Sequence, residues 1–500
     1  MPQKFPAVFK LGADATLRLG IGPQLLQLPA RPVAFAFLFA AALICGDLAK
    51  AGDPVIDRAA VLEDLQVVRT EYLNKEMAYT AATRSMAEAL LASLENQAGS
   101  LTAATFAVQL AEVGALTDNA HSGLRRWDPR AQPIARLPLH LLWLPGALIV
   151  ARATGAAADL AGATVIKIEG QSPRAFYQGA KVLVGGSDAG REHWLNSWVE
   201  SAGILHALGL AKSADAVSMK LRLFDGRVID RTIAMVPVAQ MAATAEGARL
   251  WSPEPVPKER DWATALRPRD VPLYLRDADH PFRSIPVHNL RALYVQFRSN
   301  EDENGFPIKE FLDTVRKYIS RIRPTNLIVD LRFDVGGNLL TTLDFMRRLA
   351  GSVAGRTYVL VGPYTFSAGI ISAAAIKKGG GNHVTIVGDT IGDRTHFWSE
   401  GTGIELPNSH YTFKYTDGQF NLEGGCSGES RCMDDMYPID VNVGPLTPDI
   451  HAPLTAAAYF ANRDPGMEAI AHDISPRHCA PLRSDRMSTP MPRGEGSSPP

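Results

Sequence analysis

The chain has 500 residues, more than one ordinary domain of about 150 residues holds, so several domains are expected. Its 46% hydrophobic and 21% charged residues can bury a sizeable core, which excludes an intrinsically disordered protein. The 51 Lys and Arg residues nearly balance the 52 Asp and Glu residues, and the mean hydropathy is −0.03, so neither a broad basic surface for nucleic acid nor a polytopic membrane protein is expected.

The N-terminal residues 1–51 have the pattern of a secretory signal peptide. Basic residues such as Lys4 and Arg31 precede an apolar run at 33–45, which is shorter than the about 20 residues that span a membrane. An A-K-A sequence ending at Ala51 follows as a cleavage site. We therefore expect a periplasmic or secreted protein with no stable membrane span after cleavage. A buried helix of the folded domain is the alternative.

Helices are the first elements predicted after this segment, within residues 55–127. Apolar residues recur there at helical spacing. A later helix follows Thr102, which is a favourable N-cap residue, and it ends in a polar turn that contains His121.

A small β-rich domain is predicted between about residues 135 and 240. Short strands lie at 148–150, 165–168 and 217–223, and a hairpin turn follows at Asp225 and Gly226. The segment ALIVARATGAAADLAGATVIKIEGQSP resembles a PDZ domain, which holds an extended peptide by adding it to a sheet edge as a strand. A β-domain that binds nothing is the alternative.

Strands and helices alternate after a Pro-rich, charged stretch at 252–270 that is expected to be a linker. The order β-α-β-α-β predicts a parallel sheet with crossover helices. Strands are predicted at 292–297, 326–331, 358–362 and 384–388, and helices at 311–322, 339–349 and 368–377. A Pro-rich tail from residue 475 is expected to be disordered.

Ser367 is a candidate nucleophile because it lies directly after a predicted strand and opens an apolar helix. Free N–H groups and the helix dipole favour an oxyanion at such a position. Serine is also a common N-cap residue with no further role. In the preceding loop, Gly336 and Gly337 let the backbone approach a substrate at the carboxyl end of a strand. An ordinary turn is the alternative there.

Several segments, taken together, resemble the tail-specific (C-terminal-processing) and tricorn-like serine peptidases. NLIVDLRFDVGGN is similar to their "DLR-N-x-GG" element, YVLVGPYTFSAG to their nucleophile segment, and VGDTIG to the following "V-G-E-x-T-x-G". TPDI, NRDPGME and LTDNAHSGL resemble further motifs of the family. The resemblance covers most of residues 55–473 in the family's order.

The resemblance implies an α/β fold: a ClpP/crotonase-like parallel-sheet core with an N-terminal helical segment and a small β-rich, PDZ-like domain. The expected parts are a signal peptide (1–51), the helical segment (52–130), the PDZ-like domain (131–250), the α/β core (251–474) and the tail (475–500).

The resemblance also implies a serine-type endopeptidase with Ser367 as nucleophile. The amides of Ala368 and of Gly336 or Gly337 would form its oxyanion hole. The expected substrates are flexible or C-terminal segments of proteins. No metal, organic cofactor or nucleic acid is expected to take part, and the chain has no CxxC pair or HExxH helix for zinc.

Two arrangements of the base occur in this family. One uses a lysine where this chain has Asp393 and Arg394, and arginine does not deprotonate. The other is tricorn-like, with a histidine as base, here His121, and an acid near the late P-D-I motif. Asp440 is the expected acid, and Asn442 is the alternative at that position.

Other features leave rival functions open. Asp334 stands where the family usually has asparagine, Ile370 replaces a polar residue, and the spacing from Asp118 to His121 is one residue longer. An inactive relative that binds peptides or apolar ligands is therefore an alternative. An acyl-CoA enzyme with the crotonase fold is another, although no basic cluster for nucleotide phosphates is visible. Separately, Cys426 and Cys432 can close a small disulfide loop in an oxidising compartment.

Overall fold

The computed structural model describes residues 55–125, 135–237, 247–255, 259, 261–267, 271–303, 305–437 and 439–475. The predicted signal peptide and the tail after residue 475 lie outside these residues. The described residues belong to one compact unit. In the described part, no helix combines the length and the apolar character that crossing a membrane requires.

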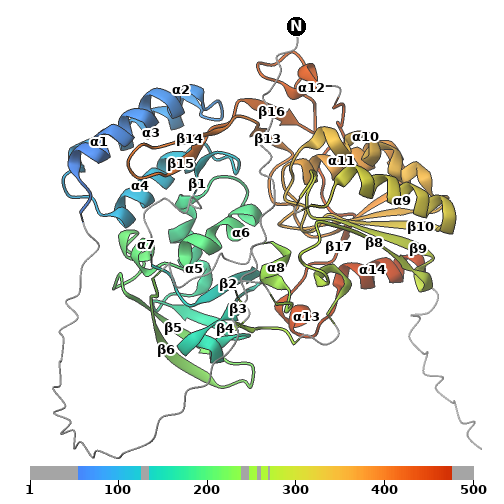
Figure 1. The fold of residues 1–500 in the computed structure, drawn as a ribbon, viewed down its shortest axis with the longest axis horizontal. Coiled ribbons are helices and arrows are strands. Elements are labelled where there is room, and N and C mark those ends of the chain that lie inside the picture. The colour runs from blue at the N-terminus through green and yellow to red at the C-terminus, as the bar shows by residue number, and fades with distance from the viewer. Residues whose placement is uncertain are drawn as a thin grey trace, which may run out of the picture. The chain divides into compact units, whose positions relative to one another are not determined.

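The predicted N-terminal helices are confirmed (Figure 1). They are α1 (Arg58–Val67), a π-helical turn (Val68–Tyr72), α2 (Leu73–Lys75), α3 (Ala81–Gln97) and α4 (Ala103–Ala115). Thr102 caps α4, since its side chain accepts a hydrogen bond from the backbone N–H of Thr105. The apolar faces of these helices share one core with the β-rich region that follows.

The β-rich region is an antiparallel sheet whose strands lie side by side in chain order. Its strands are β2 (Leu139–Leu144), β3 (Ala147–Ala153), β4 (Thr164–Ile168), β5 (Ala216–Arg222) and β6 (Val228–Ala234). The predicted hairpin turn is confirmed, with Gly226 at φ 89°. Three α-helices between β4 and β5 were not predicted: α5 (Pro173–Ala180), α6 (Asp188–Val199) and α7 (Ala202–Ala207). Each of these helices begins after a serine N-cap, at residue 172, 187 or 201, which is the local sequence feature that could have predicted it.

The stretch 252–270 was expected to be a linker, but its described residues pack against the β-rich region. Glu259 is 2% exposed, and its Oε2 lies 2.8 Å from Nε of buried Arg152. The short strand β7 (Ala263–Thr264) pairs with β3. The proline content favoured a linker, whereas a buried ion pair and a strand pairing hold the segment in place.

The α/β core contains the predicted parallel sheet, with spatial order β17-β12-β11-β10-β9-β8. All neighbours are parallel except β8, which is antiparallel at one edge. The strands are β8 (Phe282–Val287), β9 (Ala292–Phe297), β10 (Asn326–Asp330), β11 (Thr357–Val361), β12 (Val384–Gly388) and β17 (Ile450–His451).

Helices cover both faces of this sheet (Figure 1). One face packs against α9 (Ile308–Ile322), α10 (Leu339–Leu349) and α11 (Ala368–Gly380), and the other against α14 (Pro465–Ile474). Alternate strand residues point to opposite faces. Val359 accordingly belongs to the core beneath α9–α11, and its neighbour Tyr358 to the core beneath α14.

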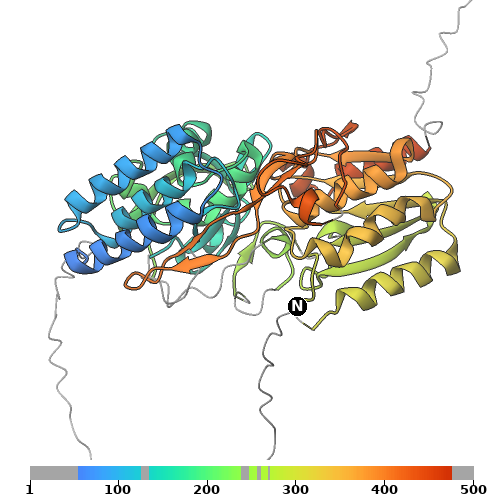
Figure 2. The same cartoon turned by 90° about the horizontal axis from the view of Figure 1, so that it is seen from above.

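An arm formed by residues 396–421 leaves the α/β core, reaches the N-terminal helices and returns (Figure 2, orange). Strands β13 (His396–Ser399) and β16 (Gly418–Asn421) pair at its base, and β14 (Gly403–Glu405) pairs with β15 (Thr412–Lys414) at its tip. Strand β15 also pairs with β1 (Gly123–Arg125). Buried Glu76 accepts hydrogen bonds from the backbone N–H (3.0 Å) and hydroxyl (2.7 Å) of Thr416. The sequence analysis did not anticipate this arm.

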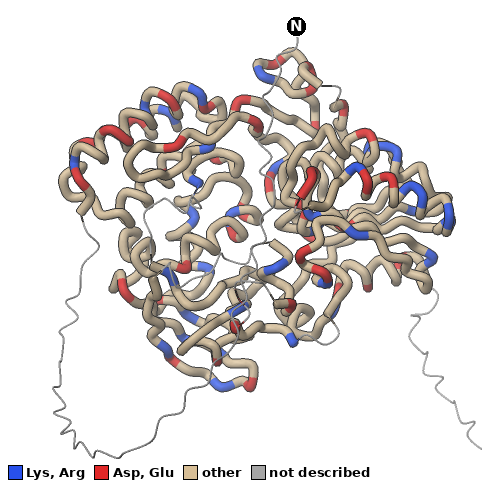
Figure 3. Tube along the Cα trace, in the orientation of Figure 1, with Lys and Arg blue, Asp and Glu red and all other residues tan. Residues whose placement is uncertain are grey.

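Basic and acidic residues are interspersed over most of the described chain (Figure 3). Several basic residues gather near the C-terminal ends of α9 and α10: Arg321, Arg323, Arg347 and Arg348.

Buried His140 links the sheet to the stretch that was expected to be a linker. Its Nδ1 lies 3.1 Å from Glu200 Oε2 and its Nε2 lies 3.0 Å from Glu259 Oε1. Burial by itself lowers the pKa of His140, but the two carboxylates more than offset this and raise it. Both ring nitrogens face an acceptor, which suits the doubly protonated ring.

We expect His140 to make the stability of the protein depend on pH. Because its pKa is raised on folding, its contribution is complete below the unfolded value of about 6.5 and is lost as the pH rises through the folded value. The free energy of unfolding should therefore fall more steeply as the pH rises above about 6.5 in the parent than in His140→Gln. Urea unfolding at several pH values measures this. Parallel pH profiles of the two proteins would contradict it.

Candidate active site

Ser367 occupies a strained position between β11 and α11. Its backbone has φ 54° and ψ −125°, a region that non-glycine residues adopt at a cost of about 1–3 kcal/mol. The N–H of Phe366 donates to the Asp334 carbonyl (2.9 Å), and the N–H of Ile370 donates to the Ser367 carbonyl (2.9 Å). These bonds hold the half-buried Ser367 side chain at the N-terminus of α11.

The glycine loop lies directly against Ser367. Gly336 has φ 102°, and a Cβ atom added there would lie 2.6 Å from Ser367 Cβ, 3.1 Å from Ser367 Oγ and 3.0 Å from the Ala368 nitrogen. Only glycine fits this position. Gly337 is turned elsewhere, since a Cβ atom on it would meet Glu301 at 3.0 Å. The structure thus brings together Ser367, Ala368 and Gly336, which the sequence placed at the ends of neighbouring strands.

A buried polar network supports this loop. Asp334 Oδ1 accepts hydrogen bonds from the Gly336 N–H (3.1 Å) and from Asn300 Nδ2 (2.7 Å). Asn300 Oδ1 in turn accepts from the hydroxyls of Thr342 (2.7 Å) and Ser372 (2.9 Å). Sequence analysis missed Asn300, which follows β9 with no local motif. The Gly336 N–H therefore donates to Asp334 rather than into open space.

Asp334 itself is fully buried, and burial raises its pKa to about 7, although the bonds from Gly336 and Asn300 act in the opposite direction. Its Oδ2 has no hydrogen-bond partner in the described part of the chain. A titratable carboxyl group thus lies directly behind the loop that contacts Ser367.

His121 reaches the same place from the turn between α4 and β1. Its ring stacks between Phe366 (centroids 4.2 Å apart, 20° between planes) and Phe397 (5.2 Å, 11°). Phe366 directly precedes Ser367, so the histidine lies beside the nucleophile segment. Burial lowers the pKa of His121 well below its usual value, which keeps the ring neutral. Among the described residues, no hydrogen bond joins His121 to Ser367.

The acid at His121 is Asp393. Its Oδ2 lies 3.8 Å from His121 Nδ1, a separation longer than a hydrogen bond. Asp393 is 3% exposed, and burial raises its pKa to about 6, while the N–H and the charge of Arg394 lower it. From the sequence, position 393 was a candidate only for the lysine base of the other family arrangement, and Asp393 was not predicted to lie at His121.

The structure does not bring Asp440 to His121. Asp440 is exposed, and its Oδ1 lies 3.2 Å from Lys378 Nζ near the C-terminal end of α11, roughly 16 Å along the helix from Ser367. Asn442 is also exposed and lies against Gly425. The chain after β16 passes through the disulfide loop first, which carries this acid away from the histidine.

Arg394 holds the His121 turn instead of acting on a substrate. Its guanidinium donates to the carbonyl (2.7 Å) and carboxylate (2.7 Å) of Asp118, and Arg191 donates to the other carboxylate oxygen (2.5 Å). Asp118 has φ 51°, so the turn is tightly wound at this residue. These bonds tie the turn to the α/β core and to α6.

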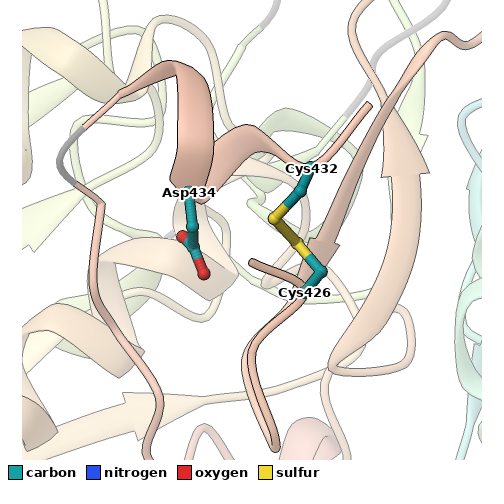
Figure 4. A group of neighbouring side chains, drawn as sticks. All are labelled: Cys426, Cys432 and Asp434. Carbon is teal, nitrogen blue, oxygen red and sulfur yellow. A yellow bond between two sulfur atoms is a disulfide. The ribbon is translucent and has the colours of Figure 1, made fainter. Parts of the chain in front are cut away.

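A possible metal ligand set near the arm does not fit a metal. Cys426, Cys432 and Asp434 lie together, but the two cysteines form the disulfide that their spacing permits, with Cα atoms 5.5 Å apart (Figure 4). Metals bind the thiolate, which a disulfide does not offer.

No protein-family model and no curated protein sequence matches the chain. Solved structures do match. Mature CPAF complexed with lactacystin aligns with a TM-score of 0.53 at 11% identity, over 83% of this chain and 98% of that chain. The chain has a CPAF-like fold. Mature CPAF alone gives a TM-score of 0.51 at 12% identity, over 83% and 97%.

A weaker match is the photosystem II D1 C-terminal processing protease, with a TM-score of 0.35 at 13% identity over 83% of this chain and 96% of that chain. Both proteins are tail-specific, S41-type peptidases. The match to CPAF confirms, at the level of the fold, the family resemblance that the motifs predicted. It concerns the mixed α/β architecture and not the individual site residues.

Asp334→Asn tests the buried carboxyl group. Because its folded pKa is raised, Asp334 makes the free energy of unfolding fall as the pH rises from about 4 to 7. Asparagine keeps the acceptor for Asn300 and Gly336 but does not titrate. Relative to the parent, we expect the variant to gain on the order of 4 kcal/mol of stability from pH 4 to pH 7.5. Chemical unfolding at the two pH values measures this. Asp313→Asn, on the surface of α9, is the matched control; an equal change there would contradict the assignment.

Proposed function

We propose that this chain is a serine-type endopeptidase that hydrolyses peptide bonds in flexible or C-terminal segments of proteins through an acyl-enzyme on Ser367. The proposal depends mainly on one observation. The loop that contains Gly336 directly contacts Ser367, whose backbone is strained and which lies at the N-terminus of a helix. The CPAF-like fold and the position of His121 beside Phe366 support the same reaction.

In the proposed mechanism, Ser367 Oγ attacks the carbonyl carbon of the scissile bond while His121 takes the hydroxyl proton. The Ala368 N–H and the N–H of Gly337 stabilise the oxyanion, because the Gly336 N–H donates to Asp334. His121 then gives the proton to the departing amine as the C–N bond breaks. Water attacks the acyl-enzyme, His121 accepts its proton, and the proton returns to Ser367 when the acid product leaves. No metal or organic cofactor takes part.

His121 has the environment of a neutral base. Its lowered pKa leaves the ring unprotonated before reaction, and two phenyl faces together with Asp393 stabilise the imidazolium that forms. Hydrogen bonds between catalytic groups are often long without substrate and shorten in its complex. We therefore assign to Asp393 the orienting role that the sequence analysis gave to Asp440.

The remaining parts of the proposal follow the family resemblance. The sheet β2–β6 would act as a PDZ-like domain that adds a substrate strand to its edge, and the parallel sheet as a ClpP/crotonase-like core. The domain limits remain 52–130, 131–250 and 251–474. The Cys426–Cys432 disulfide supports a periplasmic or secreted location, where such bonds persist.

A peptide-binding relative without hydrolytic activity is the second candidate. The absence of a hydrogen bond between the described side chains of His121 and Ser367 favours it, as does the strong burial of both ring nitrogens. Binding of peptides without turnover is the property that separates this candidate from the first.

Labelling of the full chain with a fluorophosphonate probe tests the proposed reaction. We expect Ser367 to react, Ser367→Ala to lose labelling entirely and His121→Ala to label about 100-fold more slowly, because general-base help accounts for roughly 10²- to 10⁴-fold. Ser320→Ala, on the exposed face of α9, is the matched control and should label normally. A folded parent that does not react would favour the peptide-binding relative.

A pair of acid-to-amide variants identifies the orienting acid. We expect Asp393→Asn to lower the labelling rate by roughly 100-fold or more, since an amide does not stabilise the imidazolium. Asp440→Asn should leave the rate unchanged, because its carboxylate pairs with Lys378. The opposite pattern would return the role to Asp440.

A further inference from the structure

A cavity of about 280 Å³ opens at the carboxyl ends of β10, β11 and β12. Segments that follow these three strands line it, together with α6, β2 and the short helix α8 (Ala248–Trp251). A cavity of about 150 Å³ is enough to hold benzene. This cavity therefore has room for one long amino-acid side chain.

The cavity borders the candidate active site. Tyr364 lines it and lies three residues before Ser367, so the two Cα atoms are at most about 11 Å apart. Phe333 lines it as well and lies three residues before Gly336. Both segments that meet at the nucleophile thus also form walls of the cavity.

The walls are rich in aromatic rings. Phe333 lies 5.7 Å from Trp251 and 5.4 Å from Tyr364, measured between ring centroids, and Trp251 lies 5.7 Å from Tyr364. Tyr274 stacks on Phe333 at 6.2 Å. The negative faces of such rings attract organic cations.

The charges of the lining residues are predominantly negative. Glu192 and Asp389 both line the cavity, and burial, with the charges of Asp188 and then Asp389, raises the pKa of Glu192 while Arg174 lowers it. The exposed Arg174 lies 3.5 Å from the Glu192 carboxylate. His193 adds no positive charge, because burial lowers its pKa to about 3.

Arg332 is the one Lys or Arg residue among the described residues that line the cavity, and its charge is already compensated. Its guanidinium lies 2.6 Å from Asp330 and 2.8 Å from Asp464, so two carboxylates face one cation. The surroundings of the cavity are therefore net negative.

Polar atoms of the lining residues also lack partners. Asn196 is 7% exposed, and its Oδ1 accepts no hydrogen bond from the described residues. The hydroxyl of Tyr274 is equally unpaired. The indole N–H groups of Trp143 and Trp251 have no partner among the described residues either. All four of these atoms are buried within the wall and are not exposed to the cavity, so the aromatic rings and the two carboxylates are the groups that a ligand would meet.

We propose that this cavity binds the cationic side chain of an arginine or lysine in the substrate, between the aromatic walls and the carboxylates of Glu192 and Asp389. An extended peptide advances about 3.3 Å per residue, so the bound side chain belongs to a residue within about three positions of the scissile bond. That the ligand is a peptide rests on the proposed function; the preference for a cation rests on the cavity alone.

Binding to the full-length Ser367→Ala protein tests this without hydrolysis. The probes are blocked alanine peptides of about seven residues with one central arginine, citrulline, norleucine or glutamate, titrated calorimetrically. Citrulline has nearly the shape of arginine but no charge. We expect the arginine peptide to bind on the order of tenfold more tightly than the citrulline and norleucine peptides, and the glutamate peptide to bind most weakly.

Charge-neutral variants in the same background locate the effect. Glu192→Gln and Asp389→Asn should each reduce the preference for arginine over citrulline by roughly threefold, and the double variant should reduce it further. Asp313→Asn on α9 is the control and should leave it unchanged. Equal binding of arginine and citrulline, no binding of the arginine peptide, or an unchanged preference in the double variant would overturn the proposal. Because no step measures hydrolysis, failure of the probe to label Ser367 in the parent would leave these results unaffected.

Discussion

The pairing of β1 with β15 ties the turn that carries His121 to an arm whose two ends lie in the α/β core. Gly123 pairs with Lys414 and Arg125 with Thr412, hundreds of residues along the chain. The same arm contributes Phe397, which closes the ring stack over His121. Such a long-range contact carries a substantial closure entropy. Buried bonds from the arm to Glu76 offset this cost, and the contact of His121 with Phe397 depends on that arrangement.

Asp330 on one side, and Asp334 and Asp393 on the other, represent two kinds of environment for a buried carboxyl group. At Asp330, burial acts to raise the pKa, but Arg332 and the hydroxyl of Tyr294 lower it overall. At Asp334 and Asp393, few donors face the carboxyl group, and burial raises the pKa. The first kind serves packing around the sheet. The second kind flanks the nucleophile, which is where perturbed groups are commonly found in enzymes.

Local patterns predicted the parallel sheet well, since buried parallel strands appear as continuous apolar runs. The predicted strand at 292–297 and helix at 339–349 match β9 and α10 residue for residue. The family resemblance implied that Gly336 or Gly337 meets Ser367, and the structure places Gly336 there. Sequence analysis failed for the helices α5–α7, and for the stretch 252–270, where prolines concealed a buried ion pair with Arg152.

By itself, the sequence determined the order of the elements, the edge of the sheet that carries the candidate site and the choice of Ser367. These features depend on the alternation of apolar residues in strands, on helix caps and on turn residues, all of which act over a few positions. Only the tertiary structure decided that Asp393 rather than Asp440 lies at His121, and that Asn300 braces the glycine loop through Asp334. Those partners are chosen by the path of the arm and by packing between distant segments, which no local spacing records.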